Sequence, residues 1–154
     1  MDKTIFRTGL SRFVTGVTII TTHDEKGQPT GFTANSFTSL SLDPPLVLFC
    51  LSRNSNCFQA FTANPSFAVN ILKESQQELA AHFATQDEAK FSGVSFRTGE
   101  TGVPLIPECL ANLECYTMEI FPGGDHMIFV GEVKETHLGE GAPLLFYRSE
   151  YHSI

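Results

Sequence analysis

The segment VTGVTIITT, residues 14–22, decides the fold class of this 154-residue chain. Eight of its nine residues are β-branched, and such side chains pack best on the pleated surface of a strand. The polar segment HDEKGQP at 23–29 follows and is typical of a turn. We therefore predict a strand at 14–22 and a second strand at 30–37 that returns beside it as a hairpin.

The same pattern continues toward the C-terminus, where short apolar segments alternate with turn-forming residues. They predict strands at 46–51, 66–72, 110–121, 127–138 and 144–147, the last of which closes the sheet. Residues 43–45, Asp-Pro-Pro, should interrupt any ladder before the first of these strands, because proline has no N–H to donate. Residues 91–107 are rich in Gly, Ser, Thr and Pro and predict irregular structure.

Three short helices are expected between the strands. We predict them at 4–13, 56–64 and 75–85, the first capped by Thr4 and the third by a capping box of Ser75 and Glu78. Several strands carry apolar residues on both faces, which favours a small closed barrel packed against helices or a second subunit. We therefore expect one mostly β (α+β) domain spanning residues 1–154.

Charge and cysteine content exclude several classes of protein. The chain has 10 Lys and Arg against 17 Asp and Glu, a net charge of −7, and so lacks the basic surface that nucleic-acid binding needs. No apolar run reaches the ~18 residues of a membrane-spanning helix. We expect no secretory signal, because no long apolar stretch follows a basic start, and hence a cytoplasmic protein. The four cysteines lack zinc-binding spacing, so we expect free thiols, Cys50 and Cys115 in the core, and no metal site.

The first candidate for a binding site is GFTANSFTSLSLDPP at 31–45. Six hydroxyl or amide side chains occur there within nine residues of predicted sheet. Together with backbone groups that leave the ladder, they can hydrogen-bond the polar edge of a flat heteroaromatic ring. The alternative is that Ser and Thr clusters of this kind simply form turns.

Two further segments suggest an anion site and a ring-binding turn. Residues 52–56, SRNSN, follow a buried strand, and their hydroxyls, arginine and free N–H groups favour an anion, although an ordinary capped helix would look the same. Residues 123–126, GGDH, form a tight turn that places His126 at the start of a strand. His126 can then donate to a carboxamide or an anionic ring, or shuttle a proton, unless it is only a solvent-exposed turn residue.

The common nucleotide and hydrolase motifs are absent from the sequence. It contains no Gly-x-Ser-x-Gly elbow, no Gly-x-Gly-x-x-Gly loop, no Walker A loop and no His-x-x-x-His pair. Any nicotinamide cofactor would therefore bind in a shallow site outside a Rossmann fold.

Four runs of sequence, in the right order and over nearly the whole chain, resemble the short-chain flavin reductase family. They are GFTANSFTSLSLDPPLVLFCLS (31–52), FTANPSFAVNILKESQQELAAHFA (61–84), KFSGV (90–94) and GGDHMIFVGEV (123–133). Members of this family are the reductase components of two-component flavin-dependent monooxygenases. The resemblance implies an FMN-binding split β-barrel, a homodimer with flavin at the subunit boundary, and NAD(P)H:flavin oxidoreductase activity.

The resemblance also implies which residues bind the cofactors. The Thr-Ala-Asn-Ser run would line the isoalloxazine ring, the segment after the next strand would hold the phosphate, and the Gly-Asp-His turn would face the nicotinamide. The implied cofactor-binding residues are Thr33, Ala34, Asn35, Ser36, Cys50, Leu51, Ser52, Arg53, Ser55, Asn70, Phe83, Lys90, Phe91, Gly124, Asp125 and His126. His126 is the implied catalytic residue, and which hydroxyl meets the phosphate stays open.

We therefore expect hydride transfer from NADH or NADPH to FMN or FAD, with the protein supplying position and hydrogen bonds. Flavin either leaves in its reduced form for a partner monooxygenase or stays bound and passes electrons onward, and the sequence leaves both open. Two alternatives also remain. One is an oxidase of the pyridoxamine-phosphate type, which needs a strongly basic phosphate pocket. The other is a non-catalytic flavin or haem module, for which His82 is the candidate axial ligand.

Overall fold

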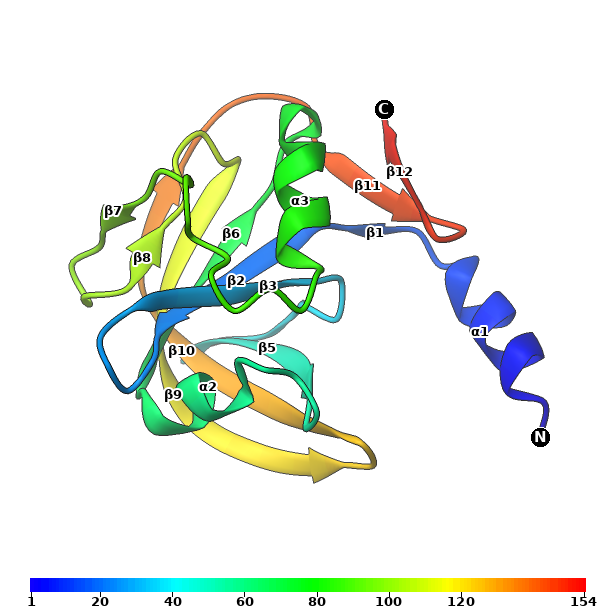
Figure 1. Ribbon diagram of the computed structural model, residues 1–154, viewed down its shortest axis with the longest axis horizontal. Helices are drawn as coiled ribbons and strands as arrows, with labels where there is room; N and C mark the ends of the chain where they lie inside the picture. Colours follow the sequence, from blue (N-terminus) through cyan, green and yellow to red (C-terminus); the bar gives the residue numbers. More distant parts are fainter.

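Seven antiparallel strands form the main sheet of the computed structural model, which describes residues 1–154 (Figure 1). The strand order is β3-β2-β6-β9-β10-β5-β4. The bounds are β2 (Thr18–His23), β3 (Pro29–Ala34), β4 (Thr38–Leu42), β5 (Pro45–Ser52), β6 (Ser66–Ile71), β9 (Ala111–Gly123) and β10 (His126–Leu138). The predicted mostly β fold is confirmed, and so is the hairpin of β2 with β3.

The segment 14–22 is divided between two sheets. Its first part, β1 (Thr15–Gly16), pairs with β11 (Leu144–Tyr147), which pairs with β12 (Glu150–Ser153). The prediction of one continuous strand was wrong, and so was the prediction that 144–147 closes the main sheet. We did not predict β12, because the turn before it has two left-handed residues, Arg148 (φ 51°) and Ser149 (φ 64°), without a glycine to signal them.

Asp43 and Pro44 form a turn and Pro45 begins β5, so the two prolines do not interrupt the sheet. Leu42 at the end of β4 pairs with Pro45 at the start of β5, which corrects the expected break. Proline is tolerated at the first residue of a strand, where its missing N–H costs no ladder bond. This hairpin brings the end of β5 back beside the residues that follow β3.

The three predicted helices are present with shorter bounds. They are α1 (Lys3–Ser11), α2 (Phe58–Ala63) and α3 (Gln77–Phe83), the last preceded by a 3-10 turn, η1 (Glu74–Gln76). Both predicted caps were wrong. The carboxylate of Asp2 caps α1 by accepting from the backbone N–H of Thr4 at 2.8 Å, and the Gln76 side chain accepts from the N–H of Lys73 at 3.0 Å. None of the helices is long and apolar enough to span a membrane.

Residues 91–107 are irregular, as predicted, except for a small hairpin of β7 (Arg97–Thr98) and β8 (Pro104–Leu105). This hairpin lies against the main sheet at the side of β2 and β6 (Figure 1). Val103 and Leu105 pack there on Ala68 of β6.

Phenylalanine rings fill the interior of the main sheet. Phe49 of β5 stacks parallel to Phe129 of β10 at a centroid distance of 4.9 Å, and the ring of Phe67 meets Phe49 edge-on. Residue 131 must be glycine, because a Cβ there would overlap the ring of Phe67. A second apolar cluster seats α3 against the sheet through Ala80 and Phe83.

The main sheet is open between its edge strands. β3 and β4 follow one another in the chain but are not hydrogen-bonded to each other, so the expected closed barrel is not present. The chain between them, residues 35–37, faces the end of β5, and the binding cavity lies at this gap.

Candidate active site

A cavity of about 360 Å³ opens where the chain leaves β3, at the end of β5 and beside the C-terminal end of α3. Three stretches of chain, one lysine and one histidine surround it. The lining residues are Phe32, Thr33, Ala34, Asn35, Ser36, Cys50, Leu51, Ser52, Asn54, Ser55, Phe83, Ala84, Thr85, Gln86, Lys90 and His126. The structure therefore brings together the three polar segments that the sequence suggested separately.

Two hydroxyl groups hold the Thr-Ala-Asn-Ser run in place. Thr33 Oγ1 donates to the carbonyl of Ala80 in α3 at 2.6 Å. Ser36 Oγ donates to the carbonyl of Cys50 at 3.0 Å and accepts from its N–H at 3.1 Å, much as a neighbouring strand would. Both hydroxyls are thus engaged within the protein. The exposed amide of Asn35, which has no protein hydrogen-bond partner, is free to meet a ligand.

Lys90 lines the cavity as a buried cation without a counter-ion. It is 3 % exposed, and its ammonium donates to the carbonyl of Gly31 at 2.9 Å. None of the ion pairs in the structure includes it. Burial lowers the pKa of Lys90, and nearby Cys57 and Asp87 oppose this only in part. An ammonium group that is buried at a cavity with spare donors fits an anionic ligand.

The end of β5 adds hydroxyls to the same cavity. Ser52 Oγ accepts from the N–H of Asn54 at 3.2 Å, and Ser55 Oγ lies 3.2 Å from Cys57 Sγ. Arg53 does not line the cavity and is exposed to solvent. The cation beside these hydroxyls is therefore Lys90, from a distant part of the chain.

The turn between β9 and β10 places His126 at the cavity. Gly124 has a φ of 67°, a backbone conformation that is strained for residues with a side chain. His126 pairs with Ser52 across β10 and β5, and its Nδ1 lies 2.7 Å from Asp125 Oδ1. Because a carboxylate only accepts, Nδ1 carries the hydrogen and Nε2 is free. The hydrogen bond from His126 lowers the pKa of Asp125.

Five residues expected to bind cofactor do not line the cavity: Arg53, Asn70, Phe91, Gly124 and Asp125. Asn70 is completely buried. Its amide donates to the carbonyl of Ile19 at 2.8 Å and accepts from the N–H of Ile106 at 3.0 Å, so it joins strands. Phe91 packs against Phe83, with ring centroids 5.0 Å apart, directly behind the lining.

Five lining residues were not named individually: Phe32 and Asn54, which lie within the candidate segments 31–45 and 52–56, and Ala84, Thr85 and Gln86. The last three follow α3, and the side chain of Asn56 holds them by donating to the carbonyl of Gln86 at 2.7 Å. This contact spans thirty residues of chain, and no local pattern signals it.

The cavity gives little support to the two alternatives. His82, the candidate haem ligand, does not line it, and its Nε2 lies 2.7 Å from the carbonyl oxygen of Lys90. A strongly basic phosphate pocket is also lacking, because Lys90 is the single Lys or Arg in the lining. The four cysteines are free, as predicted; Cys115 is buried, whereas Cys50 faces the cavity. No cluster of side chains suited to a metal ion is present.

Several proteins of similar sequence are named as flavin reductases or as reductase subunits. The reductase subunit HsaB of a flavin-dependent monooxygenase from Mycobacterium tuberculosis is 42% identical over 158 residues, covering 100% of this chain and 83% of the relative. An NADH-dependent FAD reductase of Streptomyces globisporus is 43% identical over 137 residues, covering 86% of this chain and 74% of the relative.

Solved structures agree with these relatives. Nitrilotriacetate monooxygenase component B from Mycobacterium thermoresistibile has a TM-score of 0.94 at 44% identity, covering 99% of this chain and 87% of that one. The Streptomyces globisporus NADH:FAD oxidoreductase, solved with NAD and FAD fragments, has a TM-score of 0.92 at 40% identity, covering 98% and 92%. The sequence model of the flavin reductase like domain matches residues 10–154. The chain therefore belongs to the flavin reductase family.

Proposed function

We propose that the chain is an NAD(P)H:flavin oxidoreductase that binds FMN or FAD in the cavity beside Lys90. Family membership and the relatives named as flavin reductases support this activity. The observation that carries the assignment of the site is Lys90, a buried ammonium with one carbonyl partner and no carboxylate. The phosphate of FMN or FAD is the missing counter-ion.

The polar groups of the cavity are assigned two roles. The hydroxyls of Ser52 and Ser55 and the ammonium of Lys90 are suited to the phosphate. The run from Thr33 to Ser36 is suited to the flat ring. When bound, the flavin supplies the hydride-accepting chemistry, and the protein's part is to hold the two rings together. The free amide of Asn35 is the side chain best placed to hydrogen-bond the ring edge.

His126 is proposed to orient the nicotinamide. Its Nδ1 is committed to Asp125 at 2.7 Å, which fixes the ring and leaves Nε2 to interact with the carboxamide. No proton transfer by His126 is required, because hydride transfer itself moves the reducing equivalent. The flavin reductase structure solved with NAD and FAD fragments supports the use of both ligands by this family.

The reduced flavin is proposed to serve a monooxygenase. Relatives that are 42% identical are named as reductase subunits of flavin-dependent monooxygenases.

We also propose that the open sheet is a split barrel completed by a second copy of the chain. Helix α1 projects away from the body of the molecule (Figure 1) and exposes Ile5, Phe6 and Leu10. An apolar helix face in water favours a partner surface.

NADH oxidation with and without added FMN tests the proposed activity. The activity predicts fast, flavin-dependent loss of NADH, with either FMN or FAD, and NADPH is assayed in parallel. Flavin that separates from the protein on gel filtration would identify it as a substrate, whereas flavin that stays with the protein would identify it as a prosthetic group. An absence of flavin-stimulated oxidation with both nicotinamides would overturn the proposal.

A further inference from the structure

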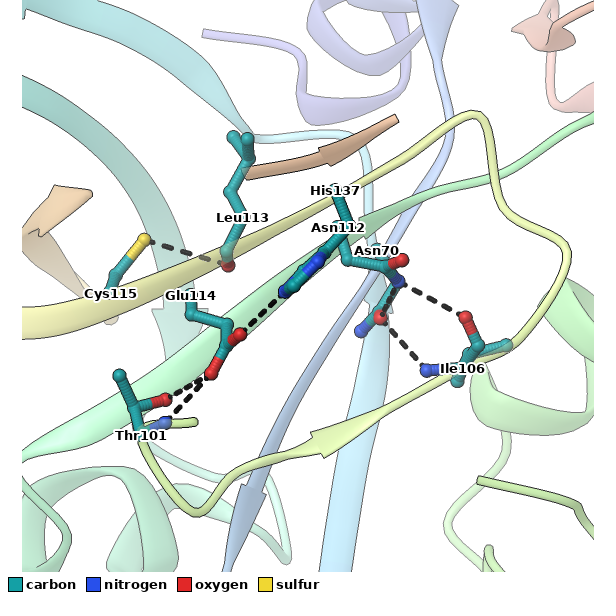
Figure 2. Close-up of polar contacts among 8 residues, drawn as sticks. All are labelled: Asn70, Thr101, Ile106, Asn112, Leu113, Glu114, Cys115 and His137. Carbon is teal, nitrogen blue, oxygen red and sulfur yellow. Dashed lines mark hydrogen bonds and ion pairs between the residues drawn. The ribbon is translucent and has the colours of Figure 1, made fainter. Parts of the chain in front are cut away.

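The hairpin of β7 and β8 is held by a carboxylate that lies outside the cavity. Glu114 of β9 is completely buried. Its Oε1 accepts from Thr101, at the turn of the hairpin, through both the backbone N–H at 2.9 Å and the hydroxyl at 2.7 Å (Figure 2). Its Oε2 lies 2.6 Å from Nε2 of His137 on β10. One carboxylate therefore joins the hairpin to two strands of the main sheet.

The turn is shaped around this carboxylate. Any side chain at Gly99 would overlap the carboxylate of Glu114, so the backbone approaches it directly. Burial alone would raise the pKa of Glu114, but the hydrogen bonds from His137 and Thr101 outweigh it, and the pKa is lowered. Glu114 is thus ionised near neutral pH, and its bonds to the hairpin are charge-assisted, which makes them about twice as strong as neutral ones.

One end of the hairpin supports Lys90 from behind. Phe96 immediately precedes β7, and its ring packs on the ring of Phe91 at a centroid distance of 5.3 Å. Phe91 is the next residue after Lys90 and is 8 % exposed. A shift of β7 would therefore move the residue adjoining the buried ammonium.

The other end of the hairpin supports the acceptor of Lys90. The carbonyl of Pro104 in β8 accepts from Thr21 Oγ1 at 2.6 Å. Thr21 is the cross-strand partner of Gly31, and the carbonyl of Gly31 is the group to which the Lys90 ammonium donates. The hairpin thus reaches both Lys90 and its partner.

Asn70 ties this second route to the sheet. Its amide nitrogen lies 3.0 Å from Thr21 Oγ1, and its oxygen accepts from Asn112 Nδ2 at 2.7 Å (Figure 2). Asn112 stands two residues before Glu114 on β9. Hydrogen bonds therefore join Asn112, Asn70 and Thr21 to the strand beside Lys90, and Glu114 lies on the same face of β9 as Asn112.

We propose that Glu114 is a positioning residue for the flavin site: by holding the turn of β7 and β8, it fixes Lys90 at the place where the flavin phosphate binds. The inference rests on the proposed function, in which Lys90 meets that phosphate. It predicts that Glu114 affects ligands with a phosphate and spares riboflavin, which has none. A role in stability alone would not distinguish these ligands.

The test is a double-mutant cycle of Glu114→Gln with Lys90→Met, with FMN and riboflavin dissociation constants measured by flavin fluorescence. Well below the unfolding temperature, Glu114→Gln should weaken FMN binding about fivefold and leave riboflavin binding unchanged. In the Lys90→Met background the same substitution should have no further effect, because the positioned group is gone. Thr22→Val is the matched control, since this buried hydroxyl donates to the Ser66 carbonyl at 2.7 Å, not to the hairpin.

Each of the other outcomes would overturn one stated part of the proposal. Equal losses for FMN and riboflavin, or an effect of Glu114→Gln that persists with Lys90→Met, would contradict the positioning role. FMN binding that is unchanged by Lys90→Met alone would contradict the phosphate assignment, and so the proposed site. If Glu114→Gln does not fold, Thr101→Val removes only the hydroxyl bond to Glu114 and should show the same selectivity with a smaller loss.

Discussion

The ammonium of Lys90 donates to the carbonyl of Gly31 at 2.9 Å and has no other hydrogen-bond partner in the protein. These residues are 59 positions apart in the chain, and their contact puts a positive charge into an interior lined by hydroxyl groups. Leaving such a charge unpaired costs stability. An anionic ligand that pairs with the Lys90 ammonium would offset this cost.

Replacing Lys90 by Met should weaken FMN binding by about ten- to hundredfold, the equivalent of a lost charge-assisted hydrogen bond. Riboflavin should bind as before. The apoprotein should melt at a higher temperature, by about 3 °C for each kcal/mol regained, because the buried charge is gone. Fluorescence titration and calorimetry of the apoprotein measure the two effects, and a variant with a lower melting temperature and unchanged FMN affinity would contradict this account of Lys90.

Replacing His126 by Ala should act on the nicotinamide and spare the flavin. We expect the KM for NADH to rise about tenfold, the value of one or two lost hydrogen bonds, with the FMN dissociation constant nearly unchanged. His152→Ala, at an exposed histidine in β12, is the control. If the KM for NADH and the FMN dissociation constant both keep their wild-type values in His126→Ala, the residue is only part of a turn.

Replacing Asn35 by Ala should weaken flavin binding more than it affects NADH. Loss of a neutral hydrogen bond to the ring edge costs about 1 kcal/mol, or roughly fivefold in flavin affinity, while NADH saturation should change less. Gln59→Ala, at an exposed amide on α2, should change neither. A larger effect on the KM for NADH than on flavin binding would show that Asn35 meets the nicotinamide and not the flavin ring.

Stability in acid should depend on Glu114. Its folded pKa is lowered, so its contribution is fully present above the unfolded value of about 4.3 and is lost as the pH falls through the folded value. At neutral pH, Glu114→Gln should reduce the free energy of unfolding by about 2 kcal/mol. Urea denaturation across this pH range should show that difference shrinking in acid. A difference that stays constant with pH would mean that the ionised carboxylate does not hold the hairpin.

The apolar face of α1 should control assembly. Phe6→Glu or Leu10→Glu places a charge on this exposed apolar face and should convert a dimer to a monomer, as seen by light scattering. Thr8→Glu adds the same charge at a residue outside the apolar set and should leave the dimer intact. A wild-type protein that is monomeric at all concentrations would contradict the proposed assembly.

Local pattern predicted most of the sheet, whereas long-range pairing decided the site. Residues 18–22 are β-branched and lie in β2, within the predicted strand, and the turn at Gly124 places His126 at the start of β10 as expected. Asn70 looked like a ligand-binding residue, but its partners Ile19 and Ile106 lie far away in the sequence. The residues after α3 were also not predicted to line the cavity, because the contact that holds them comes from Asn56, thirty residues before Gln86 in the chain.

The most direct test is to mix the flavin-loaded protein with one equivalent of NADH without oxygen and follow the visible absorbance of the flavin. The account predicts that this equivalent of NADH rapidly bleaches the absorbance of the oxidised flavin, and that the bleaching is slower in His126→Ala. The absorbance should return when air is admitted. Bound flavin that keeps its absorbance in the presence of excess NADH and excess NADPH would contradict the claim that this cavity brings the two rings together.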